Sequence, residues 1–318
     1  MEMLFMGGGK PLPPKYAWEK VPDWYASYGS GIGRTGKYLA ALTLSGYQNY
    51  ATFLDLDTTK VIGSGSYTNN LGHYAEKYAV STIGATQANA LTFTAGGYTS
   101  GNPTRNCYRM NLSGTPPSRV QTLSITPNTF TARTNVGLCG THGESNYAGY
   151  IYGGANSTGE ANPLSTMYRV DLTGSAGIVA MTYTGTPGAL MNPAMCHHHD
   201  IGLWMHGGNT GSAVTNKLWR MDLTTNTWTE VIPTGMTMPA LKMHSMYYYG
   251  GYIYIFGGSD GSNNNLFTYR YEVATNTLTM LDGTLPIAAH LTGNVLYYDG
   301  YLYGYSGPGA GNLIRMRI

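Results

Sequence analysis

The feature that most constrains the fold of this 318-residue chain is a hydrophobic run that ends in Gly-Gly and recurs about every 50 residues. Four runs, LTFTAGG, YIYGG, LWMHGG and YIYIFGG, end at Gly97, Gly154, Gly208 and Gly258. The same spacing reaches Gly46 and Gly307, where a serine replaces the first glycine of the pair. The chain therefore contains six copies of one unit, and units of this length are typical of stacked or ring-shaped repeat proteins.

Each repeat has the pattern of a four-stranded meander. A polar loop follows the glycine pair, and a strand such as LWRMDL, a short turn such as TTN and a last strand such as TWTEVI come next. Glycine accounts for 44 residues and charged residues for only 11%, a composition that excludes helical bundles and coiled coils. Because a single meander cannot bury both of its faces, we expect an all-β protein in which the repeats pack against one another.

The two ends of the chain complement each other. The sixth repeat reaches Ile318 in its third strand, and YAWEKV at residues 16–21 matches NTWTEV at residues 226–231, the fourth strand of another repeat. A strand from the N-terminus would remove an exposed sheet edge. We therefore predict a six-bladed β-propeller over residues 16–318, closed by an N-terminal strand, with residues 1–15 as a leader outside the ring.

The repeat resembles the kelch repeat, whose marks are a strand ending in Gly-Gly, an aromatic residue in the third strand and a tryptophan in the fourth. The tryptophan is present as Trp228 and Trp18. The resemblance covers residues 16–318 and implies a kelch-like propeller. It implies no single activity, because propellers of this kind serve as enzymes, adaptors and lectin-like modules.

Charge and cysteine content exclude several classes of partner. The 18 basic and 16 acidic residues are scattered, so we expect no nucleic-acid partner. Cys107, Cys139 and Cys196 are odd in number and lie in apolar runs, which predicts reduced core residues. The opening MEMLFMGGGKPLPP has the features of neither a membrane span nor a secretory signal, so we expect no membrane insertion.

Candidate ligand-binding residues fall into two sets. The loops after the glycine pairs are long and polar while the opposite turns are short, which favours a recognition surface on the loop face; alternatively, these residues only complete turns. A second set lies near the ends of the inner strands, where a propeller has its central channel. The candidates are Tyr98, Asn156, Asn209 and Asp260 on the loops, and Arg133, His198, His244 and His290 near the channel.

The segment CHHHD at residues 196–200 is the main metal candidate, because thiolate and imidazole bind zinc and copper. On an extended strand His197 and His199 would point one way and Cys196 and His198 the other, so at most two ligands would converge. We therefore expect no metal and no other cofactor. The repeated arginines beside acidic residues are interpreted as structural pairs; they are Arg109, Arg169, Arg220, Arg270 and Arg315.

No catalytic residue is assigned, because the sequence has no Walker loop, HExxH, GxSxG or GxGxxG motif. Abundant Tyr, Asn, Thr and Gly with low charge suggest a non-enzymatic recognition protein of a bacteriophage virion, in the tail, fibre or capsid surface. It would be made in the host cytoplasm and bind a cell-surface glycan or another virion or assembly protein. The alternative is a sugar-acting enzyme, such as a sialic-acid epimerase or a glycan lyase, that uses Arg133, His198, His244 or His290 near the channel.

The leader is the predicted attachment segment. Met3, Leu4, Phe5 and Met6 are consecutive apolar residues that no blade requires, and three glycines follow them. Burial of such side chains in the groove of a partner would stabilise docking.

Overall fold

The structure is a computed structural model that describes only part of the chain, and its described residues are predominantly β-strand. The described residues are 15–21, 31–45, 48–66, 79–82, 90–99, 102–103, 105, 107–113, 116–117, 119–125, 130–141, 148–157, 160–171, 177–287, 295–305 and 312–318. His290 and the leader residues Met3, Leu4, Phe5 and Met6 lie outside them.

These residues form six four-stranded sheets in which neighbouring strands are antiparallel. The first three sheets are β2 (Gly31–Thr35), β3 (Tyr38–Ser45), β4 (Gln48–Asp55) and β5 (Lys60–Ser66); β6 (Ala79–Thr82), β7 (Ala90–Ala95), β10 (Cys107–Ser113) and β11 (Arg119–Ile125); and β12 (Gly137–Gly140), β13 (Ala148–Tyr152), β14 (Met167–Asp171) and β15 (Ile178–Met181).

The other three sheets follow the same meander. They are β16 (Ala194–His198), β17 (Gly202–His206), β18 (Leu218–Asp222) and β19 (Thr227–Val231); β20 (Ser245–Tyr249), β21 (Tyr252–Phe256), β22 (Phe267–Glu272) and β23 (Thr277–Thr284); and β24 (Val295–Tyr298), β25 (Tyr301–Tyr305) and β26 (Leu313–Arg317) with β1 (Trp18–Lys20). A two-stranded hairpin of β8 (Tyr98–Thr99) and β9 (Asn102–Pro103) extends one loop.

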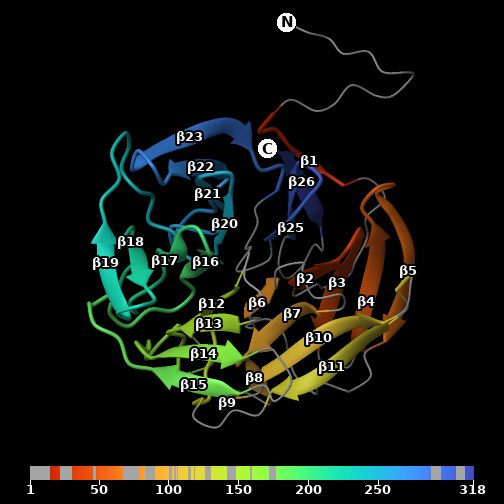
Figure 1. Cartoon of the computed structure of the whole chain (residues 1–318), viewed down its shortest axis with the longest axis horizontal. Helices are drawn as coiled ribbons and strands as arrows, with labels where there is room; N and C mark the ends of the chain where they lie inside the picture. Colours follow the sequence, from red (N-terminus) through yellow and green to blue (C-terminus); the bar gives the residue numbers. More distant parts are fainter. Residues whose placement is uncertain are drawn as a thin grey trace, which may run out of the picture.

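The sheets surround a common centre, as Figure 1 shows. The inner strands β2, β6, β12, β16, β20 and β24 contact one another in that order, and β24 contacts β2 again. The hydrophobic core lies between adjacent sheets: one cluster joins Trp204 of β17 to Tyr271 of β22, and another joins Leu39 of β3 to Tyr303 of β25. The prediction of an all-β propeller is therefore confirmed.

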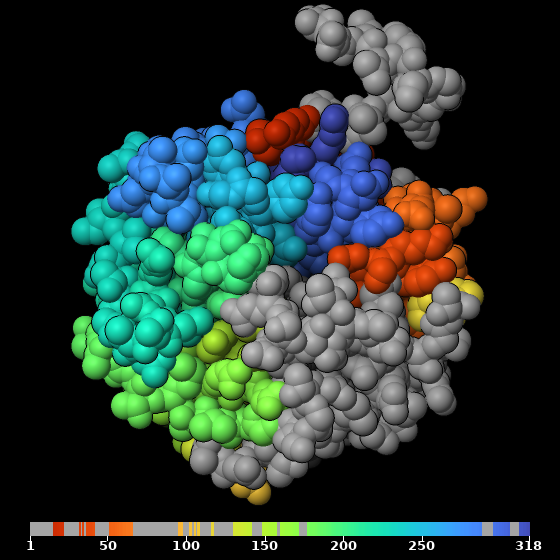
Figure 2. All heavy atoms as spheres, viewed as in Figure 1, coloured from red at the N-terminus to blue at the C-terminus, as the bar shows by residue number. Residues whose placement is uncertain are grey.

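The N-terminal strand lies where the sequence comparison placed it. Strand β1 pairs antiparallel with β26, so that Trp18 lies opposite Met316, as Trp228 lies opposite Met221 in the fourth sheet. The Trp18 indole packs on Phe256 and donates a 2.7 Å hydrogen bond to Thr268. In Figure 2 the red residues of this strand lie beside the dark blue end of the chain. Both ends of the described chain thus contribute to one sheet.

The Gly-Gly pairs connect each sheet to the next. Gly153 has a φ of 65°, and a Cβ at this position would collide with the carbonyl oxygen of Leu190, which lies in the segment leading to β16. The N–H of Gly154 donates a 2.8 Å hydrogen bond to that same oxygen. The pair is glycine because the backbones of two sheets meet with no room for a side chain. The same arrangement joins Gly96-Gly97 to Arg133 and Gly207-Gly208 to Leu241.

Cys107, Cys139 and Cys196 are buried and free, which confirms the prediction of reduced core residues. Desolvation raises the pKa of each thiol and keeps it protonated. Within the described residues there is no helix with the length and hydropathy needed to cross a membrane.

Candidate functional site

Each inner strand has two ends with different surroundings. We call the end where the chain enters from the preceding sheet the link end; for β12, β16 and β20 it comprises residues 133–136, 190–193 and 241–244. We call the other end, where the chain turns into the second strand, the hairpin end. Five extended residues separate the two ends by about 17 Å. The loops that follow the glycine pairs lie at the link end, where bridges join Thr134 to Ala155, Met191 to Asn209 and Lys242 to Ser259.

Arg133, at the link end, is completely buried. Its guanidinium makes five hydrogen bonds, one for each N–H that an arginine offers. The acceptors are the carbonyl oxygens of Thr131 (3.1 Å) and Gly153 (2.8 Å) and the hydroxyls of Thr166 (2.8 Å), Tyr168 (2.9 Å) and Thr131. Burial lowers its pKa, although Tyr168 opposes that shift. Arg133 therefore fixes the segment that enters β12 against β13 and β14 of the same sheet, with every donor used inside the protein.

His244 is also at the link end and is also completely buried. Its Nε2 lies 2.8 Å from Nδ1 of His206, the last residue of β17, in an edge-to-face arrangement. Desolvation lowers the pKa of His206 to about 4 and that of His244 well below its ordinary range. Both imidazoles are therefore neutral at pH 7 and form part of the connection between the fourth and fifth sheets.

The polar loop residues are used to hold the loops in place. The carboxylate of Glu160 receives hydrogen bonds from the side chains of Asn209 (3.0 Å) and Asn192 (3.4 Å) and pairs with Lys242 at 2.5 Å. Glu160 lies in a loop of the third sheet and Asn209 in a loop of the fourth, while Asn192 and Lys242 precede the fourth and fifth sheets, so the cluster joins three sheets at the link end. Asp260 is exposed and accepts backbone N–H groups of Ser262 and Asn263, bonds that lower its pKa.

For the two other loop candidates, Asn156 and Tyr98, the structure describes fewer contacts. Asn156 is exposed, and its backbone N–H donates to the carbonyl of Asn162 at 3.3 Å. Tyr98 begins β8, whose backbone pairs with Pro103, and its side chain lies outside the described part of the structure. Binding of a ligand by these loop residues stays a prediction.

The hairpin end carries exposed aromatic side chains instead. Tyr249 ends β20 and Tyr297 lies in β24 of the next sheet; their rings are stacked at 4.3 Å, and their hydroxyls are 2.9 Å apart. The hydrogen bond between the two hydroxyls raises the pKa of Tyr249, so its phenol is neutral at pH 7. On the neighbouring strand β16, His198 packs 4.7 Å from the Tyr248 ring. Each of these contacts joins the hairpins of two adjacent sheets.

The pattern continues into the first sheet. The Arg34 guanidinium of β2 lies 5.2 Å from the centre of the Tyr298 ring, and the Tyr298 hydroxyl donates a 2.5 Å hydrogen bond to Asp57. That bond raises the pKa of Tyr298 to about 12. Four consecutive hairpins are thus connected by ring contacts. We call this set the aromatic arc; its members are Arg34, His198, Tyr248, Tyr249, Tyr297 and Tyr298.

The three histidines of CHHHD do not alternate as predicted. Strand β16 ends at His198, and His199 and Asp200 belong to the turn, so the two-residue period stops before His199. His197 is buried against Tyr150, while His199 is about half exposed. His198, His199 and Asp200 therefore lie together, each with a potential ligand atom within 4.8 Å of the others. The prediction that no more than two ligands converge locally was wrong, because it extended the strand by one residue.

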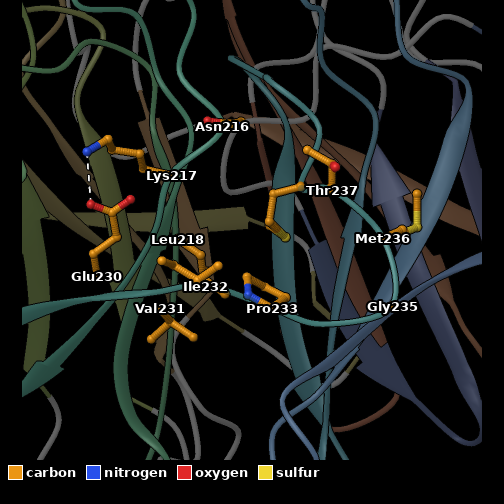
Figure 3. Close-up of a pocket in the computed structure, with 11 residues that line it drawn as sticks. Asn216, Lys217, Leu218, Glu230, Val231, Ile232, Pro233, Gly235, Met236 and Thr237 are labelled. Atoms are coloured by element: carbon orange, nitrogen blue, oxygen red, sulfur yellow. Dashed lines mark hydrogen bonds and ion pairs between the residues drawn. The ribbon is translucent and has the colours of Figure 1, made fainter.

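A groove of about 370 Å³ lies outside the ring at the edge of the fourth sheet (Figure 3). Lys217 and Glu230 form a 2.9 Å ion pair on one side of it, and Ile232, Pro233 and Met236 line the apolar part. The Ile232 side chain is 78% exposed. The groove contains none of the residues predicted from the sequence.

The predicted channel residues do not form one site. Arg133 and His244 lie buried at the link end, whereas His198 lies at the hairpin end, about 17 Å away along an inner strand. A catalytic arrangement needs groups within hydrogen-bond reach of one substrate, and these three residues do not provide it. The interpretation of the repeated arginines as acid pairs holds for Arg315, which pairs with Glu19 of β1 at 2.5 Å. Arg220 and Arg270 instead lie over the rings of Trp204 and Tyr252.

Sequence reasoning missed the aromatic arc, although a signal was present. The arc tyrosines directly precede the tight turns Gly250-Gly251 and Asp299-Gly300, in the runs MYYYGG and LYYDG. A tyrosine next to a turn at the end of an inner strand has little protein around it. These positions would therefore place aromatic side chains on the surface.

The glycine-linked sheets arranged in a ring define a propeller of the kelch type. The model of the KLHDC2/KLHL20/DRC7 Kelch-repeats domain matches residues 82–307, more than half of the chain, so this protein belongs to that family. No curated protein matches the sequence.

Proposed function

We propose that this protein is a non-enzymatic, six-bladed recognition propeller, closed by its N-terminal strand, that binds a protein partner at the hairpin end of its ring. Six four-stranded sheets and the closed order of contacts between inner strands support six blades. The pairing of β1 with β26 supports the closure. Membership in a kelch-repeat family fits a protein-binding role.

The observation that carries the proposal is the aromatic arc. Tyrosine and arginine are enriched at the energetic centres of protein interfaces, because they bury a large area and also offer hydrogen bonds. Tyr249 is 40% exposed, although its ring is stacked and its hydroxyl is bonded. The stacking fixes the side chain before a partner arrives, which reduces the entropy lost on binding.

A photo-crosslinking amino acid tests which face binds. Placed at Tyr249, it should capture one partner from the native source, since that side chain lies within the arc. The matched control is Val179 on the outer strand β15, a side chain that is 63% exposed and far from the inner hairpins. Crosslinks from Val179 alone would contradict the proposal. Crosslinks from Asn156 or Asp260 alone would move the binding surface to the loops.

A virion location, a glycan ligand and attachment through the leader stay predictions based on composition. A glycan array probed with the purified protein tests the ligand. Binding that Asn209→Ala and Asp260→Ala abolish, while Tyr249→Ala leaves it intact, would favour glycan recognition by the loops.

A further inference from the structure

We propose that His198, His199 and Asp200 form a binding site for one divalent transition-metal ion, with zinc as its representative, at the β16–β17 hairpin. The site goes beyond partner binding and does not depend on it. Its residues lie at one edge of the aromatic arc, on the surface of the hairpin end.

The distances within the cluster suit a metal. The Asp200 carboxylate places one oxygen 3.2 Å from Nδ1 of His198 and the other 2.8 Å from Nε2 of His199. Two ligand atoms that each lie about 2.0–2.2 Å from a zinc ion are roughly 3 Å apart. The carboxylate is therefore already at ligand spacing from both imidazoles. His199, which is 51% exposed, can move its ring to bring the two nitrogens closer together.

The ligand types select the ion. Two imidazole nitrogens and one carboxylate oxygen suit zinc, copper or nickel, whereas calcium and magnesium prefer oxygen ligands alone. The ion would replace the 3.2 Å hydrogen bond that the Asp200 backbone N–H now donates to Nδ1 of His198.

The fold holds the three residues in this arrangement. The Tyr248 ring packs 4.7 Å from His198 and restricts that imidazole to one side of the hairpin. The Ile201 N–H donates a 3.1 Å hydrogen bond to the His198 carbonyl, which closes the turn. Because Asp200 is 53% exposed, the remaining coordination positions face solvent. Water or an outside ligand would complete the shell, as in zinc sites with three protein ligands.

Isothermal titration of the EDTA-treated, dialysed full-length protein with zinc chloride at pH 7.5 tests the proposal. We expect one equivalent to bind, and His199→Ala to weaken the affinity by roughly tenfold or more. The matched pair is Asp200→Asn against Asp299→Asn, because Asp299 occupies a hairpin turn of the sixth sheet that has no histidine next to it. Asp200→Asn should weaken binding, whereas Asp299→Asn should leave it unchanged.

Two results would overturn the site. One is the absence of zinc binding in protein whose circular dichroism shows that it is folded. The other is unchanged zinc binding in the triple variant His198→Ala, His199→Ala, Asp200→Asn, which would place the metal elsewhere in the chain. Substitution with cobalt gives an independent measurement: a visible absorption band should appear with the native protein and be absent from the triple variant.

Discussion

The two ends of one inner strand, β20, have opposite roles. At its link end His244 is completely buried and bound to His206, and at its hairpin end Tyr249 is 40% exposed. The link end joins sheets through backbone carbonyls, glycines and the buried His206–His244 pair. The hairpin end joins sheets through surface rings. His244 at the first end is therefore enclosed by the fold, whereas Tyr249 at the second lies on the surface, where a partner can reach it.

This difference shows which polar residues of a repeat protein are good functional candidates. Arg133 and His244 are conspicuous in the sequence, but in the structure Arg133 bonds the Gly153 carbonyl of the sheet that it enters, and His244 bonds His206 of the preceding sheet. Buried polar groups form their hydrogen bonds within the protein, so residues of this kind mark places where a link segment is held against a sheet. Each of the following experiments tests whether the two ends differ as described.

The largest effect is expected from a glycine at the link end. Gly153→Ala would force a Cβ against the Leu190 carbonyl at a φ of 65°. Strain and collision together should lower the free energy of unfolding by about 3–5 kcal/mol. Gly250→Ala is the matched control, because Gly250 has a similar φ of 58° with open space around it. It should cost about 1 kcal/mol. If Gly153→Ala and Gly250→Ala lose equal stability in urea unfolding, the contact between Gly153 and the Leu190 carbonyl is not tightly packed.

Arg133→Lys should have the next largest effect. Lysine keeps the charge, but it cannot supply five donors in one plane, so buried acceptors such as the Gly153 carbonyl would lose their partner. We expect a loss of about 2–4 kcal/mol in the free energy of unfolding. The control Arg220→Lys affects only an exposed arginine over the Trp204 ring and should cost under about 1 kcal/mol.

The buried histidine pair predicts a dependence of stability on pH. The pKa of His206 is about 4 in the folded protein and 6.5 when unperturbed, so between these values the unfolded chain binds a proton that the folded protein does not. Its contribution is fully present above pH 6.5 and is lost as the pH falls toward 4. From this group we expect a loss of about 2 kcal/mol between pH 7 and pH 5.

Urea unfolding of the native protein and of His206→Gln at both pH values measures this contribution. Whatever the stability of the variant at pH 7, its loss between pH 7 and pH 5 should be smaller than that of the native protein. A pH dependence in His206→Gln as steep as in the native protein would mean that other groups cause it.

Much of the fold could be predicted because it depends on local pattern. The Gly-Gly pairs mark places where no side chain fits, and the likeness of YAWEKV to NTWTEV predicts that β1 is an outer strand. Backbone packing of this kind can be recognised in the sequence, since only glycine avoids the collision at position 153.

The site could be predicted only in part, because it depends on where a strand ends and on what surrounds a side chain. Alternation was continued through His199, but β16 stops at His198, and one residue decides whether three ligands converge. Asp260 was chosen for its polarity, and its carboxylate caps its own loop. Neither the end of a strand nor the partner of a carboxylate can be read from spacing alone.

The smallest effect is expected at the hairpin end. Tyr249→Phe removes the 2.9 Å contact between the hydroxyls of Tyr249 and Tyr297 but keeps the rings stacked. Because water can replace a hydrogen bond at this exposed position, the free energy of unfolding should change by less than about 0.5 kcal/mol. Partner capture at the arc should weaken in Tyr249→Ala, which also removes the stacking. A loss above about 2 kcal/mol in Tyr249→Phe would make the hairpin end a structural joint like the link end. The tyrosines would then be explained by the fold alone, and the case for a binding surface there would lose its main support.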